Sequence, residues 1–159
     1  MAAGGSGVEF KVICTGLDQL KGKIDDFHLA LGITVHAAVQ KIANHVAERA
    51  VANAPIKTGA LRAAMLPVNP GLVSRNVTAL VVDTMVYALR MHEDFYNLGP
   101  ISVQQPMTPE GGVGRKYIER VVHYWAATYA NYIKQCILDI IGSGGTVKVS
   151  AGVRDIAPL

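Results

Sequence analysis

The sequence has few of the residues and segments on which catalysis, metal binding and membrane insertion depend. Its two cysteines, Cys14 and Cys136, lie far apart and match no metal-ligand spacing. No apolar run approaches the roughly 18–20 residues that a membrane-spanning helix needs, and residues 1–7 lack the basic start and apolar stretch of a signal peptide. We therefore expect a soluble protein that is not secreted, in which both cysteines act as small apolar residues.

The catalytic motifs that come nearest to a match are all incomplete. His92-Glu93 begins a zinc-protease motif, but Tyr96 stands where the second histidine is needed. The glycines of residues 111–114 lack the lysine and serine of a phosphate-binding loop, and no serine has a nucleophile-elbow context. We predict no enzyme activity, cofactor or metal site, and a hydrolase that uses His92 and Glu93 is the weakest hypothesis.

The positive charge of the chain is small and scattered. The net charge is +3, whereas a nucleic-acid-binding protein usually concentrates basic residues on one face. A nucleic-acid-binding module nevertheless stays open as an alternative function, and salt-dependent binding to duplex DNA would identify it. The basic residues available to such a module are Lys21, Lys23, Lys41, Arg49, Lys57, Arg62, Arg115, Lys116 and Arg120.

What the chain does contain is enough apolar sequence for one folded domain with two arms. It has 159 residues, of which 50% are hydrophobic. Residues 1–7 are rich in glycine and predict a flexible amino-terminal arm. Residues 8–141 form the predicted domain. The Gly-Ser-Gly-Gly run that starts at residue 142 predicts a linker, which leads into a strand-like arm that ends at residue 159.

The amino-terminal half of the domain predicts one strand and one long helix. In residues 8–15 one face of a half-buried strand would carry Val8, Phe10, Val12 and Cys14, and the other would carry Glu9, Lys11, Ile13 and Thr15. Residues 20–52 have helical spacing, with Asp18 as a plausible N-cap and Gly32 as a site for a bend or a break. The apolar stripe of this helix consists of Ile24, Phe27, Leu31, Val35, Val39, Ile42 and Val46.

The carboxy-terminal half predicts a small antiparallel sheet and a second helix, so the expected fold class is α+β. Residues 63–70 and 77–84 form strands with a turn at Pro70-Gly71, and the strand at 8–15 is a possible third member. Residues 100–114 have no periodicity, and we expect this loop to contact a neighbouring protein and to be dispensable for folding. Residues 115–141 form a helix, and its apolar face consists of Ile118, Val122, Trp125, Tyr129, Ile133, Cys136 and Ile140. That face indicates a core or a subunit interface.

The first helix runs into a corner with distinctive chemistry. Pro55 stops the helix, Thr58 is placed to cap a new turn, and Gly59 permits an unusual backbone dihedral. Leu61 is expected to be buried. The guanidinium of Arg62 either lies in solvent or pairs with a carboxylate or with helix-end carbonyls, within the chain or across subunits.

Several segments occur in an order that resembles a known family. An early strand ends in Thr-Gly-Leu-Asp-Gln-Leu at residues 15–20, and a long helix runs into Ala-Pro-Ile-Lys-Thr-Gly-Ala-Leu-Arg at 54–62. Val-Val-Asp-Thr, Tyr-Ala and His-Glu follow between 81 and 93, and Gly-Arg-Lys-Tyr-Ile at 114–118 opens the last helix. This order resembles the tail-component family of long-tailed bacteriophages, small head–tail neck proteins also described as tail-completion or minor tail proteins. The resemblance covers roughly residues 8–141, and residues 54–62 are its most specific part.

The resemblance implies an α+β fold with a small antiparallel sheet, a long helix and a carboxy-terminal helix. It implies a structural protein of the virion, made in the host cytoplasm, whose copies form a ring between the head-side connector and the tail tube. A hexamer is favoured over a dodecamer, and DNA would pass through the ring without specific binding. A tail terminator that caps the tube is the alternative within this class. The candidate structural and interface residues are Pro55, Thr58, Gly59, Leu61, Arg62, Tyr87, His92, Glu93, Arg115, Tyr117 and Trp125.

Overall fold

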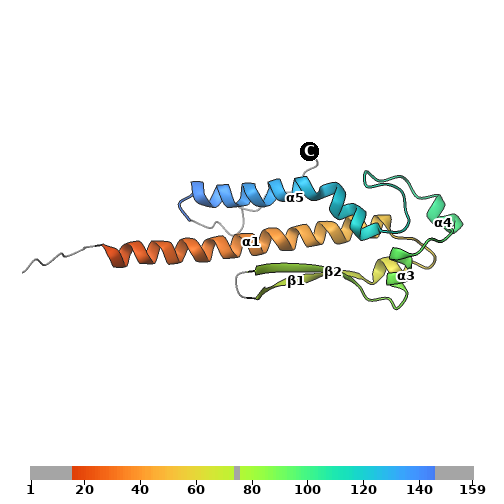
Figure 1. Cartoon of the computed structure of the whole chain (residues 1–159), viewed down its shortest axis with the longest axis horizontal. Coiled ribbons are helices and arrows are strands. Elements are labelled where there is room, and N and C mark those ends of the chain that lie inside the picture. The colour runs from red at the N-terminus through yellow and green to blue at the C-terminus, as the bar shows by residue number, and fades with distance from the viewer. Residues whose placement is uncertain (1–15, 74–75, 146–159) are drawn as a thin grey trace, which may run out of the picture.

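The computed structural model describes residues 16–73 and 76–145, and it has an α+β fold, as predicted (Figure 1). The strands expected at residues 8–15 and beyond residue 145 lie outside the described residues. The elements follow the order α1 (Leu17–Asn53), α2 (Ala60–Ala63), β1 (Met65–Val73), β2 (Asn76–Asp83), α3 (Ala88–Glu93), α4 (Pro100–Val103) and α5 (Tyr117–Gly142).

Helix α1 is the central layer of an elongated molecule. Helix α5 packs along one side of α1, and the hairpin of β1 and β2 packs along the other (Figure 1). The short elements α2, α3 and α4 gather at the carboxy-terminal end of α1. The main core lies near this end, where Ala50 and Leu61 meet Val121 and Trp125.

Helix α1 is one unbroken segment of 37 residues, so Gly32 does not divide it. It ends at Asn53, and Ala54 is already extended, as Pro55 predicts. The N-cap is Gly16 in a left-handed conformation, with no side-chain cap, so the prediction of Asp18 as N-cap was wrong. Asp18 instead lies in the first turn, where its charge favours the helix dipole.

The buried face of α1 consists mainly of small residues, and of the apolar stripe expected from periodicity only Val46 is fully on it. Ala38 packs against Tyr132 and Cys136 of α5, which lets the two helices approach closely. Ile24, predicted in the stripe, is 55% exposed. The reason is that α1 extends past the end of α5, since Phe27 already lies against Gly145. Among the described residues, the large apolar side chains before Phe27 therefore have no partner helix.

The hairpin is longer than the sequence predicted. Its antiparallel register pairs Met65 with Asp83 at the base and Val73 with Asn76 at the far end. The predicted turn at Pro70-Gly71 was wrong, because both residues belong to β1. They coincide with a register irregularity between Val68 and Gly71, which explains why turn-forming residues occur inside a strand.

Helix α5 confirms the predicted carboxy-terminal helix but turns a slightly different face inward. Val122, predicted on the apolar face, is 44% exposed, whereas Val121 is fully buried. The buried positions recur at intervals of three or four residues, as a packed helix requires. They are Tyr117, Val121, Trp125, Tyr129, Tyr132, Cys136 and Ile140.

Candidate functional site

The corner after α1 has the geometry that its sequence predicts at most positions. Gly59 has φ 82°, a left-handed conformation that other residues adopt only with strain, and it is the N-cap of α2. Leu61 is buried in the main core. The cap expected from Thr58 is weak, because its Oγ1 accepts a bond from the Ala60 amide at 3.5 Å and α2 has no side-chain cap.

Arg62 fixes this corner to the end of α1. Its Nε donates to the carbonyl oxygen of Ala54 at 2.9 Å, and its Nη2 donates to that of Ala52 at 3.0 Å. The last carbonyls of a helix have no partner within the helix, so a forked cation can satisfy two of them at once. This confirms the predicted pairing of Arg62 with helix-end carbonyls. Burial lowers the pKa of the guanidinium from its usual value.

A groove of about 790 Å³ lies beside the corner, between residues 55–61 and residues 87–102. Ser102 joins its two sides, because its Oγ accepts from the Ile56 amide at 2.8 Å and donates to the Ile56 carbonyl at 3.0 Å. The groove collects five of the candidate residues that the sequence indicated: Pro55, Thr58, Gly59, Leu61 and Tyr87. Its remaining apolar lining includes Met91, Phe95, Leu98 and Ile101.

A buried carboxylate lies behind the corner and was not predicted from the sequence. Glu110 accepts from Arg49 Nε at 2.6 Å and from Arg49 Nη2 at 2.8 Å, and it also accepts from Trp125 Nε1. The side chain of Glu110 is fully buried. Burial raises its pKa, but the bonds from Arg49 and Trp125 outweigh burial and hold the pKa at about 2. No pattern distinguishes Glu110 in an irregular loop, because both of its partners are distant in sequence.

The same network corrects the expectation that the loop at 100–114 is dispensable for folding. Thr108 Oγ1 lies 2.6 Å from Asn53 Oδ1, and the Gly114 amide donates to the Asn53 carbonyl at 3.0 Å. Asn53, Glu110 and Val113 are all buried. Deletion of this loop would therefore expose the end of α1 and leave the Arg49 charge without its partner.

His92 and Glu93 belong to a cluster of charges that joins α3 to the start of α5. Glu93 Oε1 lies 2.7 Å from His92 Nδ1, and Glu93 Oε2 lies 2.6 Å from Lys116 Nζ. Lys116 also contacts Glu119 at 2.9 Å, and its amide donates to the His92 carbonyl. The Lys116 cation, with a smaller contribution from His92, lowers the pKa of Glu93. The Glu93–Lys116 ion pair and the bond from the Lys116 amide to the His92 carbonyl position α3 against the start of α5.

Three further candidate residues occupy different environments. Tyr117 is 1% exposed, and its hydroxyl donates to Asp83 Oδ2 at 3.1 Å, which ties α5 to the base of the hairpin. Arg115 is exposed, with its guanidinium 3.6 Å from the centroid of the Phe95 ring. Trp125 lies in the core, with its ring 4.8 Å from that of His45. Of the two interpretations of the aromatic face, the core fits Trp125.

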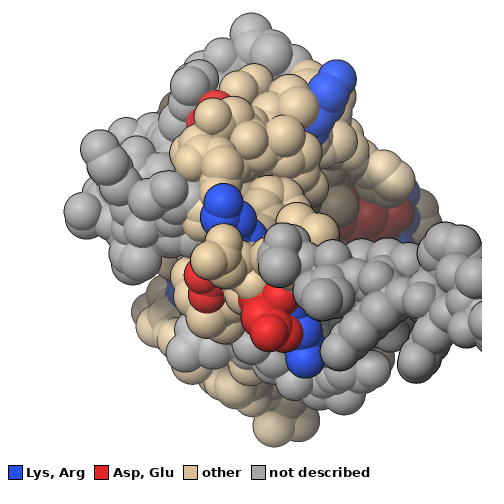
Figure 2. All heavy atoms as spheres, turned by 90° about the vertical axis from the view of Figure 1, so that its left-hand side faces the viewer, with Lys and Arg blue, Asp and Glu red and all other residues tan. Residues whose placement is uncertain are grey.

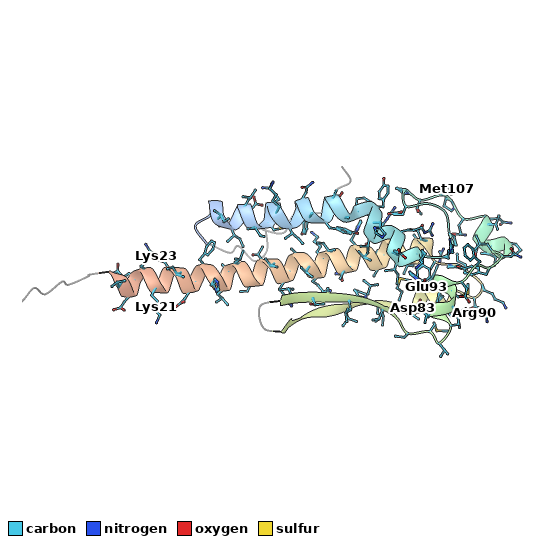
Figure 3. All side chains as sticks on the ribbon, in the orientation of Figure 1. Lys21, Lys23, Asp83, Arg90, Glu93 and Met107 are labelled. Carbon is cyan, nitrogen blue, oxygen red and sulfur yellow. The ribbon has the colours of Figure 1, made fainter. Side chains whose placement is uncertain are left out.

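Several of the basic residues that the nucleic-acid-binding alternative would use make contacts within the molecule. Arg49, Arg62 and Lys116 have the partners given above, and Arg120 Nη1 donates to the Gly112 carbonyl at 2.8 Å. Lys21 and Lys23 project from the free end of α1, at the opposite end of the molecule from Arg90 and Glu93 (Figure 3). Viewed from that free end, acidic and basic side chains are interspersed (Figure 2).

The described residues lack two features that would point to a ligand or a bilayer. Within residues 16–73 and 76–145, no three His, Cys, Asp or Glu side chains are grouped so as to hold a metal ion. Across the same ranges, no helix combines the length and the apolarity needed to cross a membrane. Comparisons of the chain with protein-family models, curated proteins and solved structures give no significant match.

Proposed function

We propose that this protein is a structural subunit of the neck of a long-tailed bacteriophage, where its copies form a ring that completes the tail and joins it to the head connector. The sequence resemblance suggests the setting. The observation that carries the proposal is physical: two separate apolar faces are exposed on different elements of one small chain. No catalytic step is part of the proposal.

The first of these, the helix face, consists of Leu17, Leu20 and Ile24 on the free end of α1. These side chains are 60%, 55% and 55% exposed. Their spacing of three and four residues places them along one side of the helix. A helix that projects past its packing partner with an apolar side uncovered is suited to contact another protein.

The second, the sheet face, consists of Leu66, Val68 and Leu80 on the side of the hairpin away from α1. Leu66 and Leu80 are 53% and 56% exposed, and Val68 pairs directly with Leu80 in the sheet register. The helix face and the sheet face differ in shape and in secondary structure. Contacts between unlike faces of identical subunits are heterologous, and they close into a ring when the rotation between subunits allows it.

A variant of the helix face tests the proposal directly. Light scattering and negative-stain images should show rings of the unmodified protein at six or, less favoured, twelve times the 16.9 kDa of the chain. The double variant Leu20→Glu with Ile24→Glu should be monomeric with unchanged helix content, because both side chains are exposed. Lys23→Glu is the matched control and should still form rings. A protein that stays monomeric with connector and tail-tube partners would overturn the proposal.

Imaging of an intact particle separates the neck from the tail terminator, the alternative within the same class. Both need a ring, but they differ in which neighbours contact it. The nucleic-acid-binding alternative has weaker support, because Arg49, Arg62, Lys116 and Arg120 make internal contacts. Binding to duplex DNA with a steep salt dependence would favour it, since phosphate contacts release counterions.

A further inference from the structure

The two strands of the hairpin differ in how well their outer edges can accept another strand. β1 contains Pro67 and Pro70, each of which removes a backbone donor. Proline inside a strand is found where its nitrogen faces an edge, so β1 is a poor template for pairing. β2 (Asn76–Asp83) has eight residues and no proline, so its edge keeps every donor and acceptor.

The described part of the sheet is also smaller than an independently stable sheet. It has two strands, with α1 against one side and the sheet face on the other. Two-stranded sheets are marginal in water, and a third strand adds both backbone bonds and apolar cover. The edge of β2 next to Leu80 and Val82 is therefore the place where an added strand would stabilise the hairpin most.

The segment at residues 8–15 has the properties that this edge requires. It is eight residues long, as β2 is, and it contains no proline. Val8, Phe10, Val12 and Cys14 alternate with Glu9, Lys11, Ile13 and Thr15, so one side of a strand formed by this segment would extend the apolar sheet face.

The point at which this segment joins α1 favours a second copy over its own hairpin. Residue 16 stands at the free end of α1, which extends past both α5 and the hairpin (Figure 1). All residues from Leu17 to Asp26 are exposed, a length of about 15 Å of helix. The residue to which this segment is joined therefore lies beyond the described end of that chain's own hairpin.

We propose that residues 8–15 of one copy add as a strand to the β2 edge of a second copy of this chain. The inference rests on the proposed function to the extent that repetition of this contact from copy to copy forms the ring. In this contact, backbone pairing gives affinity and the apolar sheet face gives specificity. The helix face, next to the donated strand, would then lie close to the neighbour's hairpin.

Disulfide trapping tests this pairing with a cysteine that the chain already has. In a Cys136→Ala background, Thr78→Cys or Leu80→Cys places a thiol on the outer side of β2, opposite the donated Cys14. Mild oxidation and a non-reducing gel should give a ladder of covalent multimers that continues past the dimer. Two controls should give no ladder. One carries Ala126→Cys instead of the β2 cysteine, and the other keeps the β2 cysteine but carries Cys14→Ala.

The other outcomes test the strand pairing and the ring independently. A product that stops at the dimer would uphold strand addition but overturn the ring, because reciprocal exchange closes after two copies. A disulfide within one chain, seen as a monomer of altered mobility, would overturn addition to a second copy. Cross-linking no greater than that of Ala126→Cys would overturn the pairing altogether.

A backbone variant within residues 8–15 gives a second, independent measurement. Val12→Pro removes a donor from the middle of the segment, whereas Gly5→Pro makes the same change outside it. Hydrogen exchange of the amides of residues 76–83 should be about ten-fold faster in Val12→Pro than in Gly5→Pro at assembly concentrations. Equal exchange in the two variants would contradict the proposed strand.

Discussion

At the scale of single residues, Glu110 makes the largest difference because it connects three parts of the chain. It lies in the loop after α4 and binds Arg49 of α1 and Trp125 of α5. We expect Glu110→Gln to lower the free energy of unfolding by about 2–4 kcal/mol, because a half-buried Arg49 loses its only buried carboxylate partner among the described contacts. Urea unfolding at fixed protein concentration measures this.

Asp94→Asn is the matched control for this carboxylate-to-amide change. Asp94 pairs with Arg90 at 3.4 Å, and both side chains are largely exposed. Exposed pairs contribute little, so the control should change the stability by less than about 0.5 kcal/mol. Equal effects of the two substitutions would show that the Glu110 network does not stabilise the fold.

The pH dependence of stability follows from the same residue. The pKa of Glu110 is lowered from 4.5 to about 2 in the folded chain, so folding favours its ionised form. The stabilisation is complete above pH 4.5 and is lost as the pH falls toward 2. The difference in unfolding free energy between the unmodified protein and Glu110→Gln should therefore shrink across this window. A constant difference from pH 6 down to pH 2 would contradict the assigned ionisation.

Arg62 offers a test of geometry in which charge is kept. Arg62→Lys retains the cation, but a single ammonium cannot reproduce a fork aimed at the carbonyls of Ala52 and Ala54. We expect a loss of about 1–2 kcal/mol in the free energy of unfolding. Arg90→Lys, at an exposed position, should change it little. If both substitutions are neutral, the bonds at the helix end add nothing to stability.

At the scale of elements, Gly32 lowers the stability of α1, and a substitution can restore it. A Cβ at this position would meet no atom within 4 Å, and the residue lies inside a continuous helix. Gly32→Ala should stabilise the protein by about 0.5–1 kcal/mol, because alanine has less backbone freedom to lose on folding.

Gly145→Ala is the contrasting control, measured by the same urea unfolding. Gly145 has φ +85°, and a Cβ there would approach the Cα of Phe27 to 3.3 Å. The substitution should therefore destabilise the protein while Gly32→Ala stabilises it. Destabilisation by both would mean that α1 is not continuous at Gly32 in solution, whereas stabilisation by both would mean that Gly145 does not contact Phe27.

The elements themselves were predictable where the signal is local, and packing was not. Helical periodicity, the stop at Pro55 and the left-handed Gly59 each depend on a few neighbouring residues. The exposure of Ile24 depends on how far along α1 the packed α5 reaches, which no local pattern encodes. The turn assigned to Pro70-Gly71 failed because a strand irregularity uses the same residue types as a turn.

In the candidate site, too, contacts between residues close in sequence were predictable and contacts between distant residues were not. The bonds of Arg62 were predictable because Arg62 is only eight residues from one carbonyl and ten from the other. Glu110 was missed because Arg49 is 61 residues away and Trp125 is 15 residues away across an irregular loop. Charged partners at such separations come together through the tertiary fold, so a single sequence does not reveal them.

At the scale of the whole molecule, the arrangement of the two apolar faces decides what kind of assembly is possible. If the helix face of one copy binds the sheet face of the next, each interface needs one face from each partner. Ile24→Glu and Leu80→Glu should then each prevent ring formation alone. Mixed in equal amounts, they should form dimers, because one variant keeps an intact sheet face and the other an intact helix face.

Sedimentation of the separate and mixed variants distinguishes contacts between unlike faces from contacts between like faces. If instead each face binds the same face of a second copy, a variant that lacks one face still dimerises alone through the other. In a heterologous assembly neither variant has a partner until the two are mixed, and growth stops at two chains because the remaining faces are both defective. Dimers of either variant by itself would therefore contradict a ring built from unlike contacts, whatever its position in a particle.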